Sequence, residues 1–222
     1  MARRLHKEDA VDQLQSDARR FRATLEGMSD EELMEQFQTG CVEAFNIIVD
    51  RFSDRLMQYL RGFLKDESQC QDMLQETFMR VYRNRHSYTR IARLSTWIYT
   101  IAGNLARSDY RRRQRWKMSS ITAQTRDGEE EFEKQLMGDI LSPDEYAESV
   151  IQDKHIQNAL MRIPVTFREV IVLRDIQDMD YESIARITAL PLGTVKSRIN
   201  RGRIKLQELL RDIYPYDNLS TV

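Results

Sequence analysis

The amino-acid sequence predicts an all-α protein with two helical domains joined by a flexible acidic linker. Glycine and proline are scarce, at 8 and 4 of 222 residues, and runs of alternating β-branched residues are almost absent. Apolar residues instead recur at spacings of three and four, which is the period of amphipathic helices. Between residues 126 and 148, nine acidic residues stand against two basic ones, and this change of composition separates two periodic segments.

The first domain is expected over residues 29–117. Ser29 followed by Glu32 has the pattern of a capping box at the start of a helix. Three amphipathic patterns follow, with apolar positions at Phe45, Ile48, Phe52, Leu56, Tyr59, Leu60 and Phe63; at Met73, Leu74, Phe78, Val81 and Tyr82; and at Leu94, Ile98, Ile101, Ala102 and Leu105. The last pattern then becomes basic, with six cationic residues from Arg107 to Lys117 against Asp109.

An N-terminal extension, residues 1–28, precedes this bundle. Val11, Leu14, Ala18, Phe21 and Leu25 fall on one face of a helix at this spacing. Such a face either covers the bundle or binds a regulator, and the sequence leaves both interpretations open.

The second domain is expected over residues 150–212, after the linker at 118–149 and before a tail at 213–222. Pro164 predicts the start of a helix, because proline is favoured at the first helical position.

A helix-turn-helix is expected near the end of the second domain. Its two helices are predicted at about 180–188 and 193–211, with the usual uncertainty at the ends. Asp180 and Thr194 are the residues expected to cap them. The small Ala185 lies ten residues before Val195, which is the spacing of this motif.

The second helix of this motif has the charge expected of a DNA-reading surface. From Gly193 to Arg211, six cationic residues stand against one acid, Glu208, while Val195 and Ile199 supply an apolar side. The remaining surface presents Lys196, Ser197, Arg198, Asn200, Arg201 and Arg203. Lysine and arginine neutralise phosphates, and arginine and asparagine read base edges. A merely solvated basic face is the alternative, but spacing, turn chemistry and charge together favour DNA binding.

Composition excludes several other classes of protein. Charged residues make up 31% of the chain and the net charge is −1, so the overall balance indicates no partner. Two cysteines, Cys41 and Cys70, and three scattered histidines predict neither a disulfide framework nor a zinc site. No cofactor is implied. Apolar runs are too short for a membrane span, and the basic N-terminus lacks the apolar centre of a signal peptide, so we expect a cytoplasmic protein.

Three sequence motifs resemble those of one family. "PLGTVKSRINRGR" resembles the C-terminal signature of the extracytoplasmic-function, or group 4, sigma factors of the bacterial sigma-70 family. "QDMLQETFMRVYRNRHSY" resembles that family's core-polymerase-binding helix in region 2. "STWIYTIAGNLARSDYRRRQR" resembles the following helix, which contacts the minus-10 promoter element. The resemblance covers residues from about 29 to 211, and the order and spacing of the motifs agree with it.

The resemblance implies an alternative sigma factor without catalysis of its own. Such a protein binds core RNA polymerase through the coiled coil of the largest subunit and the β flap, directs the enzyme to specific promoters and helps to melt the minus-10 element. Promoter DNA and an anti-sigma factor are the other implied partners. Region 2 is expected over residues 29–117 and region 4 over residues 150–212.

The resemblance also implies three sets of contact residues. Polymerase binding is expected from Asp72, Gln75, Glu76, Thr77 and Phe78. Minus-10 DNA binding is expected from Asn84, Arg85, His86, Ser87, Tyr88, Thr89, Trp97, Asn104, Arg111 and Arg112. Minus-35 DNA binding is expected from Tyr181, Thr194, Lys196, Ser197, Arg198, Arg201 and Arg203, with Arg174 as an additional candidate. Trp97 is as well explained by a place in the core, Tyr110 is undecided, and the aromatic Tyr99 stands beside them at the start of the same helix.

Two positions depart from the family pattern, and the linker has two interpretations. Ala189 stands where the family usually has glycine at the turn, and a positive φ there costs alanine about 1 kcal/mol. Gly103 stands where the family typically has arginine, which removes one contact and weakens the helix.

The family's linker passes through polymerase near the RNA exit path. The acids of this linker either mimic nucleic acid there or form a solvated tether, which we favour.

Two other function classes explain less of the sequence. A stand-alone helix-turn-helix regulator with an N-terminal sensor domain would bind a palindrome as a free dimer, but it leaves the "QDMLQETF" segment unexplained. A metal-dependent nuclease requires clustered carboxylates, whereas the acids here concentrate in the linker, without histidine or glycine in a recognisable site.

Overall fold

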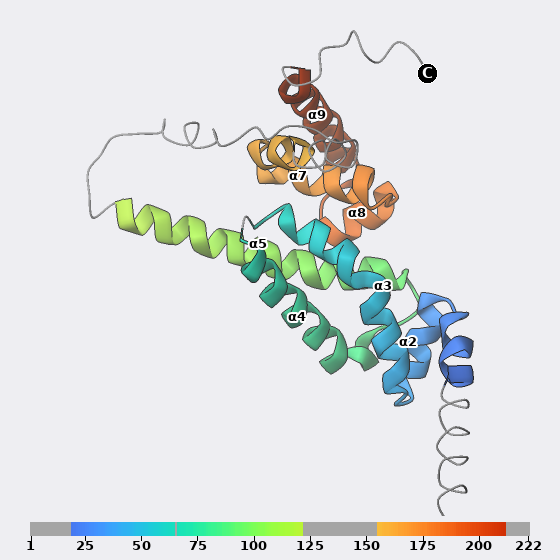
Figure 1. Ribbon diagram of the computed structural model, residues 1–222. Coiled ribbons are helices and arrows are strands. Elements are labelled where there is room, and N and C mark those ends of the chain that lie inside the picture. Colours follow the sequence, from blue (N-terminus) through green and yellow to red (C-terminus); the bar gives the residue numbers. More distant parts are fainter. Residues whose placement is uncertain (1–18, 65, 122–154, 212–222) are drawn as a thin grey trace, which may run out of the picture.

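A computed structural model describes residues 19–64, 66–121 and 155–211, which form helices and connecting turns without a β-strand (Figure 1). Side chains at 117–121 are outside this description. The helices are α2 (Asp30–Gln38), α3 (Val42–Arg61), α4 (Glu67–Arg83), the 3-10 turn η1 (Arg85–Ser87), α5 (Leu94–Ile121), α7 (Val165–Ile171), the π-type turn η2 (Val172–Ile176), α8 (Tyr181–Thr188) and α9 (Leu192–Arg211). Residues 19–26 and 155–162 are also helical. The all-α prediction is confirmed; the linker and most of the N-terminal extension lie outside the described residues.

The first bundle consists of α2, α3, α4 and the first half of α5. The predicted capping box begins α2: the backbone N–H of Ser29 donates to Glu32 at 2.7 Å, and that of Glu32 donates to Ser29 Oγ at 3.3 Å. Of the predicted apolar stripe, Ile48, Phe52, Leu56, Tyr59, Leu60 and Phe63 are buried, whereas Phe45 is half-buried. Ala44 and Ile47 of α3 are buried as well. Of the extension's apolar face, Leu25 is buried in the bundle and Phe21 is exposed.

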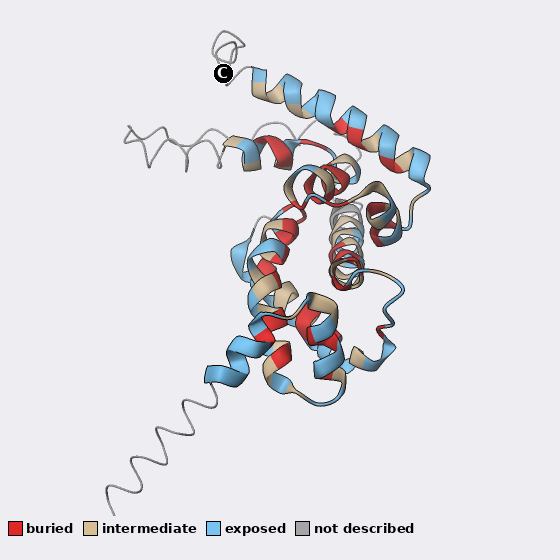
Figure 2. Ribbon diagram, turned by 90° about the vertical axis from the view of Figure 1, so that its right-hand side faces the viewer, coloured by how far each residue is buried: buried red, intermediate tan, exposed pale blue. Residues whose placement is uncertain are grey.

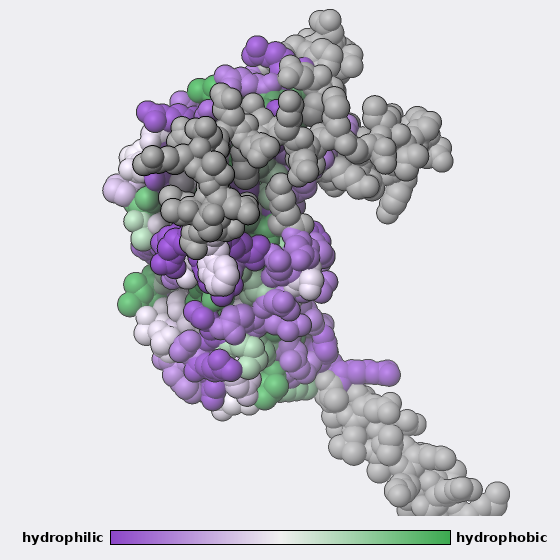
Figure 3. Space-filling model, turned by 90° about the vertical axis from the view of Figure 1, so that its left-hand side faces the viewer, coloured by the Kyte–Doolittle hydropathy of each residue, from purple (hydrophilic) through white to green (hydrophobic). Residues whose placement is uncertain are grey.

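Helix α5 has two halves with different environments. Leu94, Ile98, Ala102 and Ala106 recur every four residues and are all buried in the bundle. The basic half continues beyond the bundle as a single projecting helix (Figure 1). At 1.5 Å per residue, the 28 residues of α5 make a rod of about 42 Å. The described surface around this end is predominantly hydrophilic in Figure 3. Of the cations that the sequence concentrates here, Arg111, Arg112 and Arg115 are exposed on this rod, whereas Arg107 is half-buried at its base.

The second domain packs α7 and α8 against α9. Pro164 immediately precedes α7, as expected. Gly202 lies in the middle of α9 facing α7, and a Cβ at this position would lie only 2.5 Å from Cδ1 of Ile171. Glycine therefore lets α7 and α9 approach closely.

The helix-turn-helix forms nearly as the sequence predicts. Asp180 caps α8 by accepting a hydrogen bond from the backbone N–H of Ser183 at 2.7 Å. Ala189 ends α8 with φ of 55°, so the left-handed conformation considered from the sequence is present. The prediction of Thr194 as an N-cap is wrong: α9 begins at Leu192, directly after Pro191, and Thr194 lies inside the first turn.

The two domains lie side by side, with α8 between α5 and α9 (Figure 1). Their buried apolar residues form one continuous core, which extends from Leu25 to Ile199. Figure 2 shows buried residues on the facing sides of the helices, while much of the outer surface of α9 is exposed. The surfaces predicted to bind polymerase and DNA therefore belong to one packed unit in this structure.

Candidate polymerase and promoter-binding surfaces

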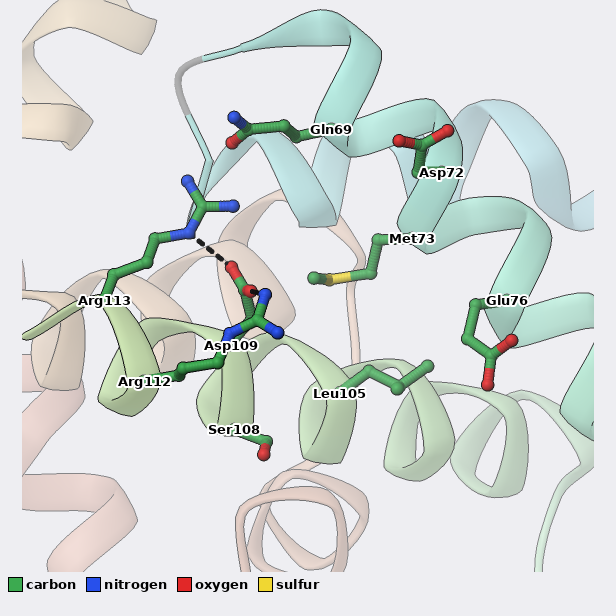
Figure 4. Close-up of a pocket in the computed structure, with 9 residues that line it drawn as sticks. All are labelled: Gln69, Asp72, Met73, Glu76, Leu105, Ser108, Asp109, Arg112 and Arg113. Atoms are coloured by element: carbon green, nitrogen blue, oxygen red, sulfur yellow. Dashed lines mark hydrogen bonds and ion pairs between the residues drawn. The ribbon is translucent and has the colours of Figure 1, made fainter. Parts of the chain in front are cut away.

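The exposed face of α4 is acidic and borders a groove. Asp72 and Gln75 are exposed, and Glu76 is half-buried. Glu76 accepts a hydrogen bond from Nε of Arg80, one turn later, at 2.7 Å. A groove of about 480 Å³ separates α4 from α5 (Figure 4). It is lined by Gln69, Asp72, Met73, Glu76, Leu105, Ser108, Asp109, Arg112 and Arg113. Because its floor includes Met73 and Leu105, the groove offers apolar area between charged walls.

The opposite wall of the groove is basic, but its charge is partly neutralised. Asp109 Oδ1 accepts from Arg112 at 2.7 Å, and Asp109 Oδ2 lies 2.5 Å from Nε of Arg113. The Asp109 side chain is only 11% exposed, whereas that of Arg112 is 68% exposed. The buried carboxylate therefore orients two arginines along α5 (Figure 4).

Two of the predicted polymerase contacts lie inside the bundle. Thr77 is fully buried, and its hydroxyl donates to the carbonyl of Met73 at 2.7 Å. Phe78 is 7% exposed and packs edge-to-face against Phe45. Both side chains hold α4 in the bundle and offer no surface to a partner, because they point to the opposite side of the helix from Asp72.

The loop predicted to capture a base, residues 84–89, is held by hydrogen bonds from its own bundle. Gln38 donates through its amide to the carbonyls of Arg85 at 2.7 Å and Tyr88 at 3.0 Å. The Arg85 guanidinium stacks over Phe37 and Tyr82, at 5.5 and 5.3 Å from the ring centroids. The loop backbone is therefore anchored to α2 and α4 before any ligand binds.

Within this loop, one predicted contact is internal. Tyr88 is 6% exposed, and its hydroxyl donates to the carbonyl of Ala92 at 2.9 Å. It packs against the half-buried Trp97 with 5.4 Å between ring centroids. The exposed loop side chains are Asn84, His86, Ser87 and Thr89. Tyr88 therefore supports the loop, and Trp97 combines a core contact with a partly accessible edge.

Further along α5, the remaining candidate DNA-contacting residues differ in how exposed they are. Tyr99 is fully buried and donates to Gln177 at 2.6 Å, so it cannot stack on a base in this arrangement. Asn104 is exposed and accepts from Arg107 at 2.8 Å. Arg111 is exposed and Tyr110 is half-buried.

The face of α9 predicted to contact the minus-35 element is largely accessible. Lys196, Ser197 and Arg201 are exposed, while Thr194 and Arg198 are half-buried. Val195 and Ile199 are buried, as predicted.

Two sets of contacts flank this predicted face. The ring of Tyr181 contacts two cations, with Arg174 at 5.2 Å and Lys196 at 5.7 Å from its centroid. Arg203 binds both carboxylate oxygens of Asp175. The predicted minus-35 residues therefore share one surface of the second domain.

Sequence reasoning missed the acids that hold these arginines. Asp109 stands three and four residues before Arg112 and Arg113, and this spacing alone predicts pairing on a helix. Asp175 lies 28 residues from Arg203, and no local pattern connects them.

The described residues contain no cluster of three or more histidine, cysteine, aspartate or glutamate side chains suited to a metal. Within the same ranges, no helix is long and apolar enough to cross a membrane.

Two known protein families match the two helical domains. Residues 48–116 match Sigma-70 region 2, and residues 154–206 match Sigma-70, region 4. The matches place this chain among helical proteins built from sigma-factor regions. Relatives that match most of the chain identify the group of sigma factors to which it belongs.

The ECF RNA polymerase sigma factor SigW of Bacillus subtilis is 32% identical over 81% of this chain and 96% of its own length. The ECF RNA polymerase sigma-E factor of Escherichia coli is 30% identical over 84% and 98%. This chain belongs to the extracytoplasmic-function sigma factors of the sigma-70 family.

Solved structures agree with this assignment. The sigma factor RpoE, solved with the anti-sigma factor NepR from Bartonella quintana, is 26% identical with a TM-score of 0.59, over 75% of this chain and 96% of its own. CnrH, solved with the cytosolic domain of CnrY, is 24% identical with a TM-score of 0.61, over 83% and 99%, and shows the same fold.

The protein is thus an alternative sigma factor that binds core RNA polymerase and promoter DNA and directs transcription from specific promoters. The interpretation as a stand-alone regulator is wrong, because both sigma regions are present in one chain.

Proposed function

We propose that the acidic face of α4, formed by Asp72, Gln75 and Glu76, is the contact with the coiled coil of the largest polymerase subunit. Support comes from the position of these side chains: they are exposed or half-exposed on one side of α4, beside a groove with an apolar floor. An acidic surface with adjoining apolar area suits a basic partner helix. Thr77 and Phe78 are left out of this contact set because they are buried.

The minus-10 element is proposed to bind the exposed side of the 84–89 loop and the basic half of α5. The anchored loop offers polar side chains at Asn84, His86, Ser87 and Thr89 around an extruded base. Arg111 and Arg112 then follow the strand backbone, where cations neutralise phosphates. Arg85, Trp97 and Asn104 complete the proposed surface as partly accessible members, while Tyr88 holds the loop from inside.

The minus-35 element is proposed to bind α9 in the major groove. Thr194, Lys196, Ser197, Arg198 and Arg201 occupy one face of a helix whose opposite face is buried. This arrangement presents hydrogen-bond donors to base edges at a fixed register. Tyr181, Arg203 and Arg174 lie at the flank as phosphate contacts, with Arg203 already oriented by Asp175.

The remaining features of the proposal concern the whole chain. Region 2 is assigned to residues 29–117 and region 4 to residues 150–212, with 118–149 as an acidic tether. The β flap is a second polymerase contact, and an anti-sigma factor is a partner, as in the complex solved for RpoE. We place the protein in the cytoplasm and assign it no catalytic activity.

Run-off transcription with purified core polymerase on genomic promoter fragments tests this function. The Asp72→Ala and Glu76→Ala double variant should lose co-purification with core polymerase by about tenfold or more while retaining its helical content, because two charged contacts are removed. Asp54→Ala, an exposed acid on α3, is the matched control and should bind normally. Normal co-purification of the double variant would refute the α4 assignment.

A further inference from the structure

Helix α2 lies beside the segment that connects α4 to α5 and bonds to it through one face (Figure 1). Glu31, Glu35 and Gln38 stand on one side of the helix, at i, i+4 and i+7. Glu31 accepts from the backbone N–H of Leu94 at 2.9 Å, and Glu35 accepts from the guanidinium of Arg90 at 3.1 Å. Gln38 donates to two carbonyls earlier in the segment, as described above. One face of α2 therefore holds the connecting segment along its length.

The tip of this segment is also fixed from within. The backbone N–H of Ile91 donates to the carbonyl of Thr89 at 2.7 Å, which closes a tight turn around Arg90. The Tyr88 hydroxyl reaches the carbonyl of Ala92, on the other side of the tip, at 2.9 Å. The backbone on both sides of Ile91 is thus held, although the segment lies at the surface.

The fixed tip presents an apolar side chain to solvent. Ile91 is 84% exposed, the highest value among the large apolar side chains of the described residues. A single exposed apolar side chain is ordinary on a protein surface. This one differs because its backbone is held on both sides, so the side chain cannot turn inward to bury its apolar area. A rigid mount for an exposed isoleucine points to a partner that covers it.

The surroundings of Ile91 indicate that this partner is DNA. The tip directly follows the 84–89 loop, which is proposed above to receive an extruded base. Arg90 and Arg93 are exposed on either side of Ile91. The Arg90 side chain remains 59% exposed even in its ion pair with Glu35. Proteins that kink DNA combine cations that bind the backbone with an apolar side chain, isoleucine among them, that enters between base steps.

We propose that Ile91 is a wedge that enters the base stack next to the base extruded into the 84–89 loop, and that the α2 face of Glu31, Glu35 and Gln38 holds it in position. Unstacking of a base step is unfavourable, and burial of the isoleucine in the gap offsets part of that cost. A filled gap also prevents the extruded base from returning to the stack. The inference rests on the proposed assignment of the 84–89 loop to the minus-10 element.

Two forms of one promoter test the wedge in the holoenzyme: the full duplex, and the same fragment with a non-complementary, already open minus-10 element. Fluorescence of 2-aminopurine in that element measures opening of the duplex, and run-off transcription measures productive complexes on both. Ile91→Ala should slow opening of the duplex by about tenfold but lower transcription from the open template by less than about twofold, because the wedge acts only on stacked bases. Ile91→Leu should retain most of the opening rate.

The matched control is Ile156→Ala, the same change at an exposed position of the second domain, and it should open the duplex at the normal rate. Equal losses on both templates, or reduced co-purification of Ile91→Ala with core polymerase, would show that Ile91 contacts polymerase or an unpaired base and would overturn the proposal. An unchanged rate on the duplex would overturn it as well. Failure of the unmodified holoenzyme to transcribe either template would count against the proposed function instead.

Gln38→Ala tests the positioning role of α2. Loss of its two hydrogen bonds to the loop should slow opening of the duplex by about three- to fivefold, again with little effect on the open template. Combined with Ile91→Ala, it should cause no further loss, because both changes act through one side chain. Gln36→Ala, at an exposed position of the same helix, is the control. Additive losses in the double variant would show that α2 does not act through Ile91.

Discussion

Helices α5 and α9 are both rich in arginine, but the acids that hold those arginines come from different places. On α5, Asp109 pairs with Arg112 and Arg113 within one turn of the same helix. On α9, Arg203 is held by Asp175, which lies in the π-type turn after α7. The charge at the projecting end of α5 is therefore arranged locally, whereas the position of Arg203 on α9 depends on the tertiary fold. Four substitutions test this difference, from the largest expected effect to the smallest.

Arg198→Ala on α9 should have the largest effect. Loss of a base-reading arginine costs about 1–3 kcal/mol of discrimination, so selective start-site use should fall by roughly tenfold or more while polymerase association remains. Lys205→Ala, at an exposed position further along α9, is the matched control. Mapping of start sites in run-off assays provides the measurement. Unchanged selectivity would remove Arg198 from the reading face.

Ala189→Gly should stabilise the fold on which α9 depends. Ala189 has φ of 55°, which is strained for alanine, so glycine should raise the free energy of unfolding by about 0.5–1 kcal/mol. Ala185→Gly, inside α8, should instead lower it by about as much, because glycine weakens a helix interior. Thermal unfolding of both variants measures whether the free energy of unfolding rises in one and falls in the other. Equal destabilisation by both would contradict the left-handed turn.

Asp109→Asn should strengthen non-specific DNA binding through α5. The change releases two arginines from their shared acid. Ion pairs whose arginine is as exposed as Arg112 and Arg113, at 68% and 41%, contribute up to about 1 kcal/mol, so affinity should rise by no more than about fivefold. The slope of affinity against salt should steepen. Anisotropy titrations on a labelled duplex at several salt concentrations measure both, with Asp54→Asn as the control. An unchanged salt slope would indicate that these arginines do not face phosphates.

Asp175→Ala should have the smallest effect. Its partner, Arg203, is 51% exposed, so loss of the pair should lower the free energy of unfolding by well under about 1 kcal/mol. Denaturant unfolding gives the value. A larger loss would mean that Asp175 fixes the position of α9 rather than only one side chain.

Much of this fold follows from local sequence patterns. The capping box at Ser29, the start of α7 after Pro164, and the buried positions Val195 and Ile199 were all predicted, because each depends on residues within a few positions. The positive φ of Ala189 was considered from the sequence, because the family usually has glycine at this turn, and it is present. The Thr194 cap was predicted wrongly because the chain enters α9 directly after Pro191.

The errors in the candidate site have a tertiary origin. The burial of Thr77, Tyr88 and Tyr99 depends on neighbours from other helices, which spacing along one helix does not specify. Tyr59 and Glu169 are 110 residues apart, and no pattern along the chain connects them. The contact residues themselves came from the family resemblance, and their assignment remains a prediction for the experiments above.

Gly103 gives the departure from the family pattern a packing reason. A Cβ at this position would lie 2.8 Å from the Tyr59 hydroxyl and 2.9 Å from Nη1 of Arg107, so no larger side chain fits without displacing both groups that contact Glu169. Substitution by the arginine typical of the family should therefore move Tyr59 and Arg107 away from Glu169 and leave that buried carboxylate without its partners. At this position the family's usual side chain and the packing of this particular molecule are mutually exclusive.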